Sequence, residues 1–541
     1  MFRRNTEHRQ QSLYESENWM KEHVRDNLRK SWAPIFYEEV FCKIDETPFA
    51  MLYSETGAPN TPVNILLALE IIKHMQDVSD ERLLEMAQFD YLVSYALGWR
   101  TLGEEEIAPR TLYYFRQRLY VHTMEHPESE NLLFGQFRAL LDGFCARTGQ
   151  KMGEQRMDTT MFMSNIKKAG RLALAFDVLR RSLRKIPAEK LNESLKEALA
   201  PDFKTKMLYR VKTEEKESRL NKLLILCHET FIILQELPEG IAADEKRIPA
   251  RLLDEQTYRN GNDNIAAKPG KEIGSGSLQS AFDEDATYHT KSGNSQSGYV
   301  LEVTETCSKD NAVQFITDYH VKPNNISDQE IIRERLAPIA ATGYQSVVAD
   351  GGFYGEKTNA VAEDAGIEMR YTDMTGQKSA FEGLRASDFE YDESGSQITR
   401  CPNGQAPIKT GETKKYITAR FDSAVCNDCS MRDRCRGKQH KGFVTVNIEK
   451  ASVKGSKRRA KINKNARENT SLRAAIEGTN SALKRKGLAK LRVRGKAKCV
   501  VICGLKAIAQ NVKRLIRFLQ GGYDKAKKSI PPLMGEVCLP R

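Results

Sequence analysis

The segment from residue 298 to residue 372 most constrains the fold, because strand-like and helix-like hydrophobic periods alternate along it. Residues 298–303 and 312–319 alternate like strands across a short gap, which predicts an antiparallel pair. A helix near 328–341, a buried strand at 346–349, a helix near 357–364 and a strand at 367–372 follow. This order predicts an α/β fold in which helices pack on a mixed sheet.

Two aspartates lie on predicted strands. The strand at 346–349 ends on Asp350-Gly351-Gly352, and ligands bind at the carboxyl ends of strands in such sheets, where glycines allow close approach. An earlier strand, 155–163, carries Asp158 as its one acid, and an unpaired buried carboxylate is costly. Asp158 could therefore pair with Arg156, cap a nearby turn, or bind a metal.

A third acid lies in the stretch 473–484, which reads R-A-A-I-E-G-T-N-S-A-L-K. On a helix, Arg473, Glu477 and Lys484 return to one face, and apolar residues follow a similar period on a neighbouring face. This pattern suits a metal ligand that works on nucleic acid, or an ordinary surface helix with intrahelical ion pairs. Glu468 is the alternative third acid.

The positive charge is concentrated near the C-terminal end. The chain carries a net charge of +12, and between residues 454 and 517 there are 20 Lys and Arg residues against two acids. Such a block repels itself unless a polyanion neutralises it, so nucleic acid is the expected partner; the alternative is a solvated basic face. The basic residues singled out as contacts are Arg473, Lys484, Arg485, Lys486, Arg492 and Arg494.

Residues 1 to about 150 are expected to be helical. Asn60-Thr61-Pro62 begins one helix, residues 79–81 cap a second, and residues 109–111 begin a third that carries Arg116 and Arg118. This spacing resembles a helix-turn-helix arrangement in which the last helix reads DNA, although a plain helical bundle has the same pattern.

Two further segments interrupt the predicted sheet. Residues 167 to about 237 are expected to be helical, and residues 239 to about 282 are polar, which predicts a mobile linker. The second segment, 376–465, carries four cysteines whose spacing resembles a zinc ribbon. They would hold structural Zn²⁺ or remain unligated thiols: Cys401, Cys426, Cys429 and Cys435.

The class of protein is bounded by length and hydropathy. At 541 residues the chain is too long for one compact core, so two to four domains are expected. No stretch approaches the roughly 18–20 apolar residues that cross a bilayer, and the N-terminal residues lack the apolar core of a signal peptide. A cytoplasmic protein is therefore expected.

Taken together, the three acid motifs resemble those of the DDE transposases of bacterial insertion sequences, which have an RNase H-like catalytic core. The third motif is similar to that family's Y-x2-R-x3-E-x6-K signature, with Arg473, Glu477 and Lys484 in register. Thr470 stands where the signature has Tyr, which puts any role of that Tyr in doubt.

The resemblance implies that Asp158, Asp350 and Glu477 hold two Mg²⁺ or Mn²⁺ ions for phosphodiester cleavage and strand transfer. Arg473 and Lys484 would bind phosphates, and the N-terminal helices would bind double-stranded DNA at the inverted repeats. The enzyme would act as a dimer or larger assembly. The alternatives are an RNase H-like nuclease without strand transfer and a catalytically inactive, transposase-derived DNA-binding protein.

The order of these segments along the chain, together with the resemblance, gives the expected domains. They are a helical DNA-binding domain at 1–150, a catalytic core at 151–166 and 286–375, a helical insertion and linker at 167–285, a Cys-containing insertion at 376–465, basic catalytic-core helices at 466–520 and a tail at 521–541.

Overall fold

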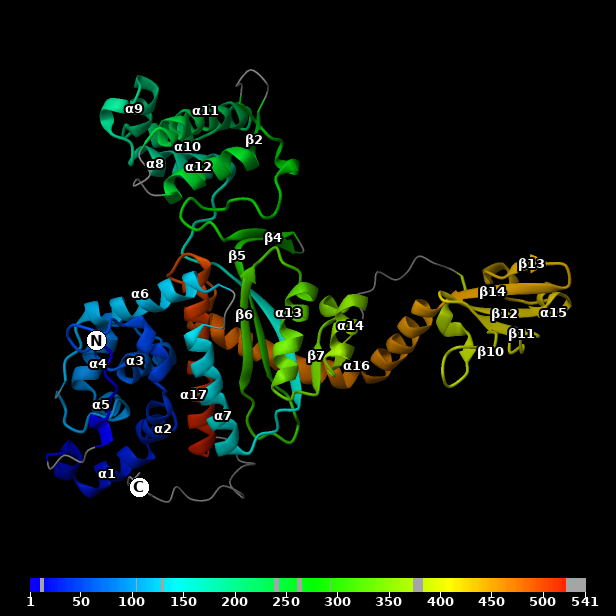
Figure 1. Cartoon of the computed structure of the whole chain (residues 1–541), viewed down its shortest axis with the longest axis horizontal. Coiled ribbons are helices and arrows are strands. Elements are labelled where there is room, and N and C mark those ends of the chain that lie inside the picture. Colours follow the sequence, from blue (N-terminus) through cyan, green and yellow to red (C-terminus); the bar gives the residue numbers. More distant parts are fainter. Residues whose placement is uncertain are drawn as a thin grey trace.

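In the computed structural model, a mixed α/β core lies between a helical N-terminal region and two smaller bodies (Figure 1). The structure describes residues 1–9, 14–103, 105–127, 131–237, 243–259, 265–291, 293–372 and 383–521. The predicted tail from Lys525 onward lies outside these residues. Within them, no helix is long and apolar enough to cross a membrane.

The core sheet has six strands, and β1 is central. Strand β5 pairs antiparallel with β1 on one side, and β6 pairs antiparallel with β5. On the other side β7 runs parallel to β1, and β8 runs parallel to β7. Strand β4 extends the far end of β5. The strands are β1 (Glu154–Phe162), β4 (Thr287–Lys291), β5 (Asn294–Thr306), β6 (Ile316–Pro323), β7 (Ser346–Ala349) and β8 (Glu368–Tyr371).

The predicted mixed sheet is confirmed, with shifted strand limits. The strand expected at 312–319 begins at Ile316, and the strand expected at 298–303 extends over the 13 residues of β5. Helices α13 (Asp328–Ala341) and α14 (Glu356–Asp364) cover the face that carries Met157 and Val347. Ser327 caps α13 by accepting from the backbone N–H of Glu330.

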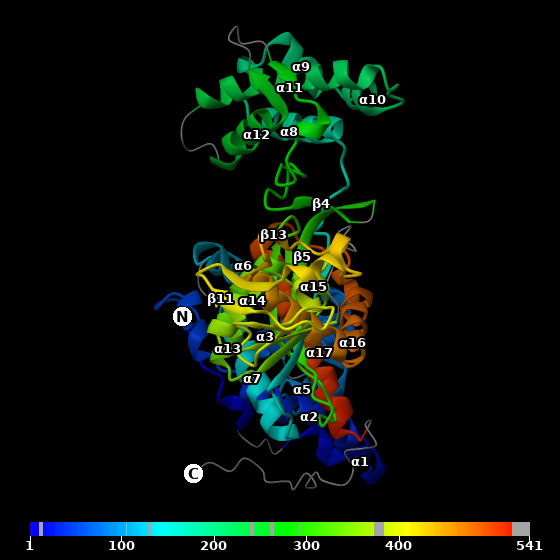
Figure 2. The same ribbon diagram turned by 90° about the vertical axis from the view of Figure 1, so that its right-hand side faces the viewer.

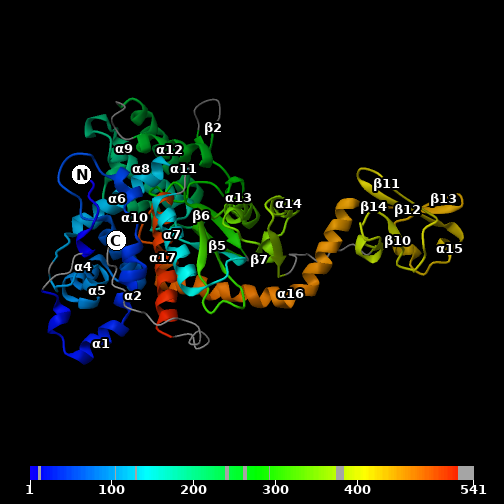
Figure 3. The same cartoon turned by 60° about the horizontal axis from the view of Figure 1, so that its bottom comes forward.

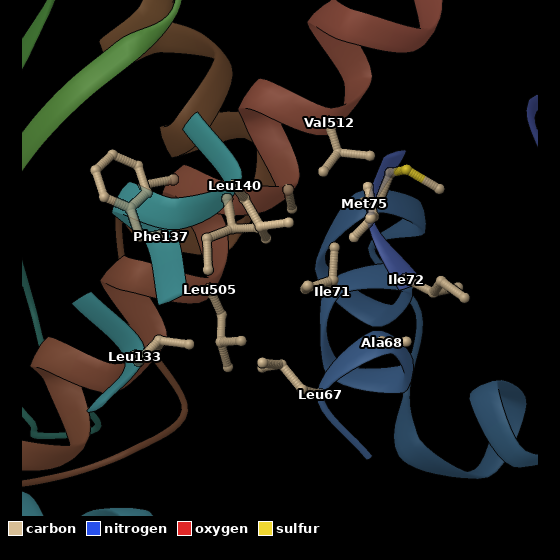
Figure 4. Packing of buried hydrophobic residues seen from close by; sticks show 14 of the residues in the cluster. Leu67, Ala68, Ile71, Ile72, Met75, Leu133, Phe137, Leu140, Leu505 and Val512 are labelled. Carbon is tan, nitrogen blue, oxygen red and sulfur yellow. The ribbon is translucent and has the colours of Figure 1, made fainter. Parts of the chain in front are cut away.

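The opposite face of the sheet packs on the N-terminal helices. Leu301, Val303 and Tyr319 of the sheet join one hydrophobic core with α3, α7 and α17. Figure 4 shows α3 side chains meeting those of α7 and α17 across this core. The helices of this region are α1 (Glu22–Lys30), α2 (Trp32–Glu39), α3 (Val63–Gln76), α4 (Asp80–Phe89), α5 (Tyr91–Ala96), α6 (Pro109–Glu125) and α7 (Leu132–Thr148).

The predicted starts of three N-terminal helices are confirmed. Pro62 precedes α3, and the side chain of Ser79 accepts from Arg82 N–H at the start of α4. Pro109 is the first residue of α6, where a missing N–H costs nothing.

Helix α16 (Lys450–Leu483) and helix α17 (Lys496–Leu519) carry most of the basic block at residues 454–517. The C-terminal part of α16 packs on β1, β7 and β8, and its N-terminal part projects away from the core (Figures 1 and 3). A turn at Lys484–Leu488 follows, in which Gly487 has a φ of 81°, a left-handed conformation that favours glycine. The chain then reverses into α17, which is buried against α3, α7 and β6.

The outer end of α16 carries a small β-sheet body with its own hydrophobic core (Figures 1 and 2). Its main sheet has the order β11-β12-β14-β13. The elements are β9 (Glu390–Tyr391), β10 (Ile398–Arg400), β11 (Lys409–Glu412), β12 (Tyr416–Asp422), α15 (Ser423–Asn427), β13 (Lys438–His440) and β14 (Phe443–Glu449).

The segment after β1 forms a helical body with a separate hydrophobic core (Figure 1). The linker expected at 239–282 is wrong for residues 243–256, which form α12; Ile248, Leu252 and Leu253 bury against the neighbouring helices and outweigh the polar composition. The elements are α8 (Arg171–Leu183), α9 (Glu193–Leu199), α10 (Phe203–Leu208), α11 (Glu215–Gln235), α12 (Ala243–Gln256), β2 (Thr257–Arg259) and β3 (Ile265–Ala267).

Candidate active site

Asp158 lies on the central strand and faces α16. Its side chain is only 11% exposed. Its Oδ1 is 3.1 Å from Nη2 of Arg473, and its Oδ2 accepts a hydrogen bond of 3.1 Å from Nδ2 of Asn480. The suggested pairing with Arg156 is wrong, because the Arg156 guanidinium binds Glu305 on the adjacent strand instead.

Asp350 directly follows β7, which runs parallel to β1, so both aspartates lie on neighbouring strands. Its Oδ1 accepts from Gly352 N–H at 2.8 Å and begins a 3-10 turn at Gly351–Phe353. A Cβ at Gly352 would lie 2.9 Å from that oxygen, so the second glycine makes room for the carboxylate. The other oxygen, Oδ2, is 3.4 Å from Nη2 of Arg473.

Glu477 completes the group from α16. Its Oε1 accepts from Nη1 of Arg473 at 3.0 Å, one helical turn earlier, and its side chain is 63% exposed. All three predicted acids therefore contact one guanidinium. Glu468, the alternative third acid, pairs with Lys309 and Arg370 instead.

Burial and ion pairing act in opposite directions on Asp158. Removal from water raises the pKa of Asp158 above its ordinary value, and the Arg473 cation offsets part of this effect. For Arg473, burial opposes the charge, but the pairs with Asp158, Asp350 and Glu477 leave the guanidinium pKa raised. Arg473 therefore favours the charged form of Asp158, whereas burial disfavours it.

The site opens into a cavity of about 530 Å³. Both carboxylates and cations line the cavity. Its lining is Asp158, Thr159, Thr160, Glu477, Asn480, Ser481, Lys484 and Arg485. Carboxylate oxygens are the donors that Mg²⁺ and Mn²⁺ prefer, so the residue types fit such ions. Among the residues that the structure describes, however, no group of three His, Cys, Asp or Glu side chains is arranged to hold a metal.

Two parts of the chain match families of known proteins. Residues 400–516 match the model of the Transposase DDE domain, which includes Glu477, Arg473 and Lys484. Residues 21–118 match the model of a transposase domain (DUF772). Both matched segments therefore belong to transposase families. No curated protein and no solved structure matched the chain. Asp158 and Asp350 lie outside the matched residues.

The predicted DNA contacts near the candidate active site divide into exposed residues and one residue that turns inward. Lys484 and Arg485 are exposed on the cavity wall. Lys486 instead turns inward and donates to the Met75 carbonyl at 3.1 Å; burial, with Lys513 beside it, lowers its pKa to about 7. Farther along, Arg492 is exposed, and exposed Arg494 donates through Nε to the Asn165 carbonyl at 2.7 Å.

The two predicted contacts on α6 have different environments. Arg116 is 14% exposed and binds Glu70 and Asp80, at 2.6 Å each, so its guanidinium is occupied within the helical region. Arg118 is exposed, and its guanidinium carbon lies 4.8 Å from the centre of the Tyr53 ring.

Sequence reasoning missed the polar residues that hold the acids in place. Asn480 is three residues after Glu477, and this i, i+3 spacing was the available signal. Its Oδ1 is buried without a hydrogen-bond partner in the described structure. Glu305 is fully buried beneath the site and binds Arg156, Thr479 and Arg514; its partners are distant in sequence, so no local pattern marks it.

The four cysteines of the predicted zinc ribbon are half-buried, free thiols in the small β-sheet body. Burial raises the pKa of the Cys426 thiol, and the neighbouring thiols of Cys435, Cys401 and Cys429 add to the effect. The four thiols are therefore neighbours, although they do not form a closed metal site in the described residues. The zinc prediction stays a prediction.

Proposed function

We propose that this transposase binds the terminal inverted repeats of an insertion sequence, cleaves DNA at the element ends and transfers the 3′-hydroxyl to target DNA. The observation that carries the proposal is the contact of Asp158, Asp350 and Glu477 with one guanidinium beside a cationic cavity. Two strands and one basic helix contribute one acid each, which supports the RNase H-like core expected from the resemblance.

The three carboxylates are the proposed ligands of two Mg²⁺ or Mn²⁺ ions. Ions bound there would activate the attacking oxygen and stabilise the leaving oxygen of a phosphodiester. Asn480 orients the Asp158 carboxylate through its amide N–H, and the Gly352 N–H orients that of Asp350. Glu477 is the most exposed of the three acids and would be the most mobile ligand.

Lys484 and Arg485 are proposed to bind the DNA backbone at the cavity. Their side chains are exposed and line the same wall as Glu477. Cations there contact phosphates without reading sequence, so they would position the scissile bond. Arg492 and Arg494, which are also exposed, extend this basic surface, whereas the inward contact of Lys486 favours a structural role.

The exposed face of α6 is proposed to read the inverted repeat. Exposed or half-exposed side chains follow at i, i+3, i+4, i+7 and i+8, which is one face of a helix. They are Arg110, Tyr113, Tyr114, Gln117 and Arg118. Arg and Gln are side chains that read guanine and adenine edges in the major groove. The occupied Arg116 is excluded from this set and assigned to the scaffold.

Two further expectations belong to the proposal. The enzyme would act as a dimer or larger assembly, because two element ends must be held together. The four cysteines of the small β-sheet body would hold structural Zn²⁺, supported by the mutual proximity of their thiols.

The proposal is tested by Mg²⁺-dependent cleavage of a DNA fragment that carries one element end with its inverted repeat. Wild type should nick the fragment at the repeat end, and Asp158→Ala should not. Glu477→Gln should also abolish nicking, whereas Glu468→Gln is the matched control, since that acid pairs away from the cavity. Loss of nicking in Glu468→Gln alone would contradict the assignment of Glu477.

A second assay separates the alternatives. Pre-cleaved element ends, supplied with target DNA and Mg²⁺, should be joined to the target by wild type. Cutting without joining would identify a nuclease. Binding of the inverted repeat without cutting, in both Mg²⁺ and Mn²⁺, would identify an inactive DNA-binding derivative.

A further inference from the structure

Arg473 occupies the middle of the carboxylate group. Its Nη2 lies 3.1 Å from Oδ1 of Asp158 and 3.4 Å from Oδ2 of Asp350, and its Nη1 lies 3.0 Å from Glu477. A single positive charge thus faces three carboxylates.

The contacts of Arg473 compete with metal ligation. The oxygens that it binds on Asp158 and Asp350 are the same type of donor that a divalent cation needs, and Mg²⁺ binds such oxygens at about 2.0–2.1 Å. A guanidinium held against these oxygens blocks the approach of the ion and repels its charge. Arg473 must therefore move before Asp158 and Asp350 can share an ion.

An alternative anion for Arg473 is available in the proposed complex. The Arg473 side chain is 20% exposed, and α16 also presents Glu477 and Ser481 to the cavity that Lys484 and Arg485 line. A phosphate that enters this cavity offers the bidentate geometry that a guanidinium prefers. Asn480 still donates to Asp158 after Arg473 leaves, so the buried carboxylate keeps one partner.

We infer that Arg473 is the internal counter-cation of the DNA-free site, and that a DNA phosphate draws it away so that divalent ions can bind. This inference rests on the proposed function. It makes DNA binding and metal binding mutually reinforcing, because an effect of one ligand on the affinity of the other is reciprocal. Metal ions are then held chiefly when DNA is in place.

The test measures Mn²⁺ affinity by electron paramagnetic resonance of the free ion, with and without a pre-cleaved element-end duplex. In wild type the duplex should tighten Mn²⁺ binding by about tenfold or more, within the usual range of coupling between sites. Without DNA, Arg473→Gln should bind Mn²⁺ about tenfold more tightly than wild type, and the duplex should add little. Lys464→Ala, which removes an exposed cation of the same helix away from the acids, should match wild type.

Equal Mn²⁺ affinity of DNA-free Arg473→Gln and wild type would overturn the inference. If Arg473→Gln fails to fold by circular dichroism, Arg473→Lys replaces it; a single ammonium cannot bridge three carboxylates, so tighter Mn²⁺ binding than wild type is again expected. Asp158→Ala distinguishes a failure of the Arg473 inference from a failure of the proposed two-metal function. Suppose that DNA-free Arg473→Gln and wild type bind Mn²⁺ equally, but that wild type binds Mn²⁺ with DNA and Asp158→Ala does not. The proposed metal site then stands, and only the role of Arg473 is refuted. If neither binds Mn²⁺, the proposed two-metal function fails as well.

Discussion

Glu305 is the residue whose replacement most directly tests how the candidate active site is held together. Its carboxylate is fully buried behind the site. Oε1 accepts from Arg156 Nε at 2.7 Å, and Oε2 accepts from Thr479 Oγ1 at 2.7 Å and from Arg514 Nη1 at 2.8 Å. Arg156 in turn donates to the Leu472 carbonyl of α16 at 2.9 Å. One carboxylate therefore ties β1, β5, α16 and α17 together.

Glu305→Gln keeps the shape of the side chain and removes its charge. The two arginines that remain are 8% and 15% exposed, so water cannot replace the lost counter-charge. Removing one partner of a buried pair typically costs about 3–5 kcal/mol, and we expect a loss of that size in the free energy of unfolding. The matched control is Glu468→Gln, because the Lys309–Glu468 pair is 68% and 47% exposed and should contribute little to stability.

The assay is guanidinium chloride unfolding followed by tryptophan fluorescence. Trp99 is buried in the same hydrophobic core as α17, so its emission reports on the part of the protein that Glu305 stabilises. The midpoint of this transition should fall clearly in Glu305→Gln and hardly move in Glu468→Gln. Equal shifts in the two variants would refute the argument that the buried network anchors α16.

Burial, followed by the charge of the neighbouring Asp318, raises the pKa of Glu302 to about 8, so between pH 4.5 and 8 the folded protein keeps a proton that the unfolded chain loses. The free energy of unfolding of wild type, relative to that of Glu302→Gln, should therefore fall by up to about 1.4 kcal/mol per pH unit as pH rises through that window. A difference between the two proteins in chemical unfolding that does not change with pH would contradict this. Gly504→Ala should destabilise the protein by about 1–3 kcal/mol, because the new Cβ would lie 2.4 Å from a buried tyrosine hydroxyl. The control Gly143→Ala on α7 has nothing within 4 Å of its Cβ and should be neutral or stabilising by up to about 1 kcal/mol. A shift in melting temperature of the same sign and size in both variants would refute the packing argument. Metal analysis should find about one Zn²⁺ per chain, lost in Cys426→Ser/Cys429→Ser, and metal-free wild type would leave these cysteines as packed thiols.

The sequence predicted features that depend on nearby residues. Apolar periods marked the strands and helices of the core, and cap residues such as Ser79 marked helix starts, because backbone geometry couples residues only a few positions apart. The isolated acid at Asp158, the Asp350-Gly351-Gly352 strand end and the spacing of Arg473 and Glu477 are local patterns of the same kind. They were therefore readable before any partner was known.

The tertiary structure decided which distant groups became partners. Arg156 could pair with Asp158 by sequence, yet it faces Glu305 across 149 positions because β1 and β5 lie side by side. Polar composition predicted a linker where apolar residues bury α12. Arg116, a candidate DNA contact by composition, is enclosed by Glu70 and Asp80.

The sequence by itself thus determined the elements, the location of the basic block and the identity of the three candidate acids, since these follow from local periodicity and charge. Only the tertiary structure placed all three acids against the guanidinium of Arg473 and supplied Asn480 and Glu305 as their supports. A long charged side chain can reach many partners, and the partner it binds depends on which strands and helices the packed core brings beside it.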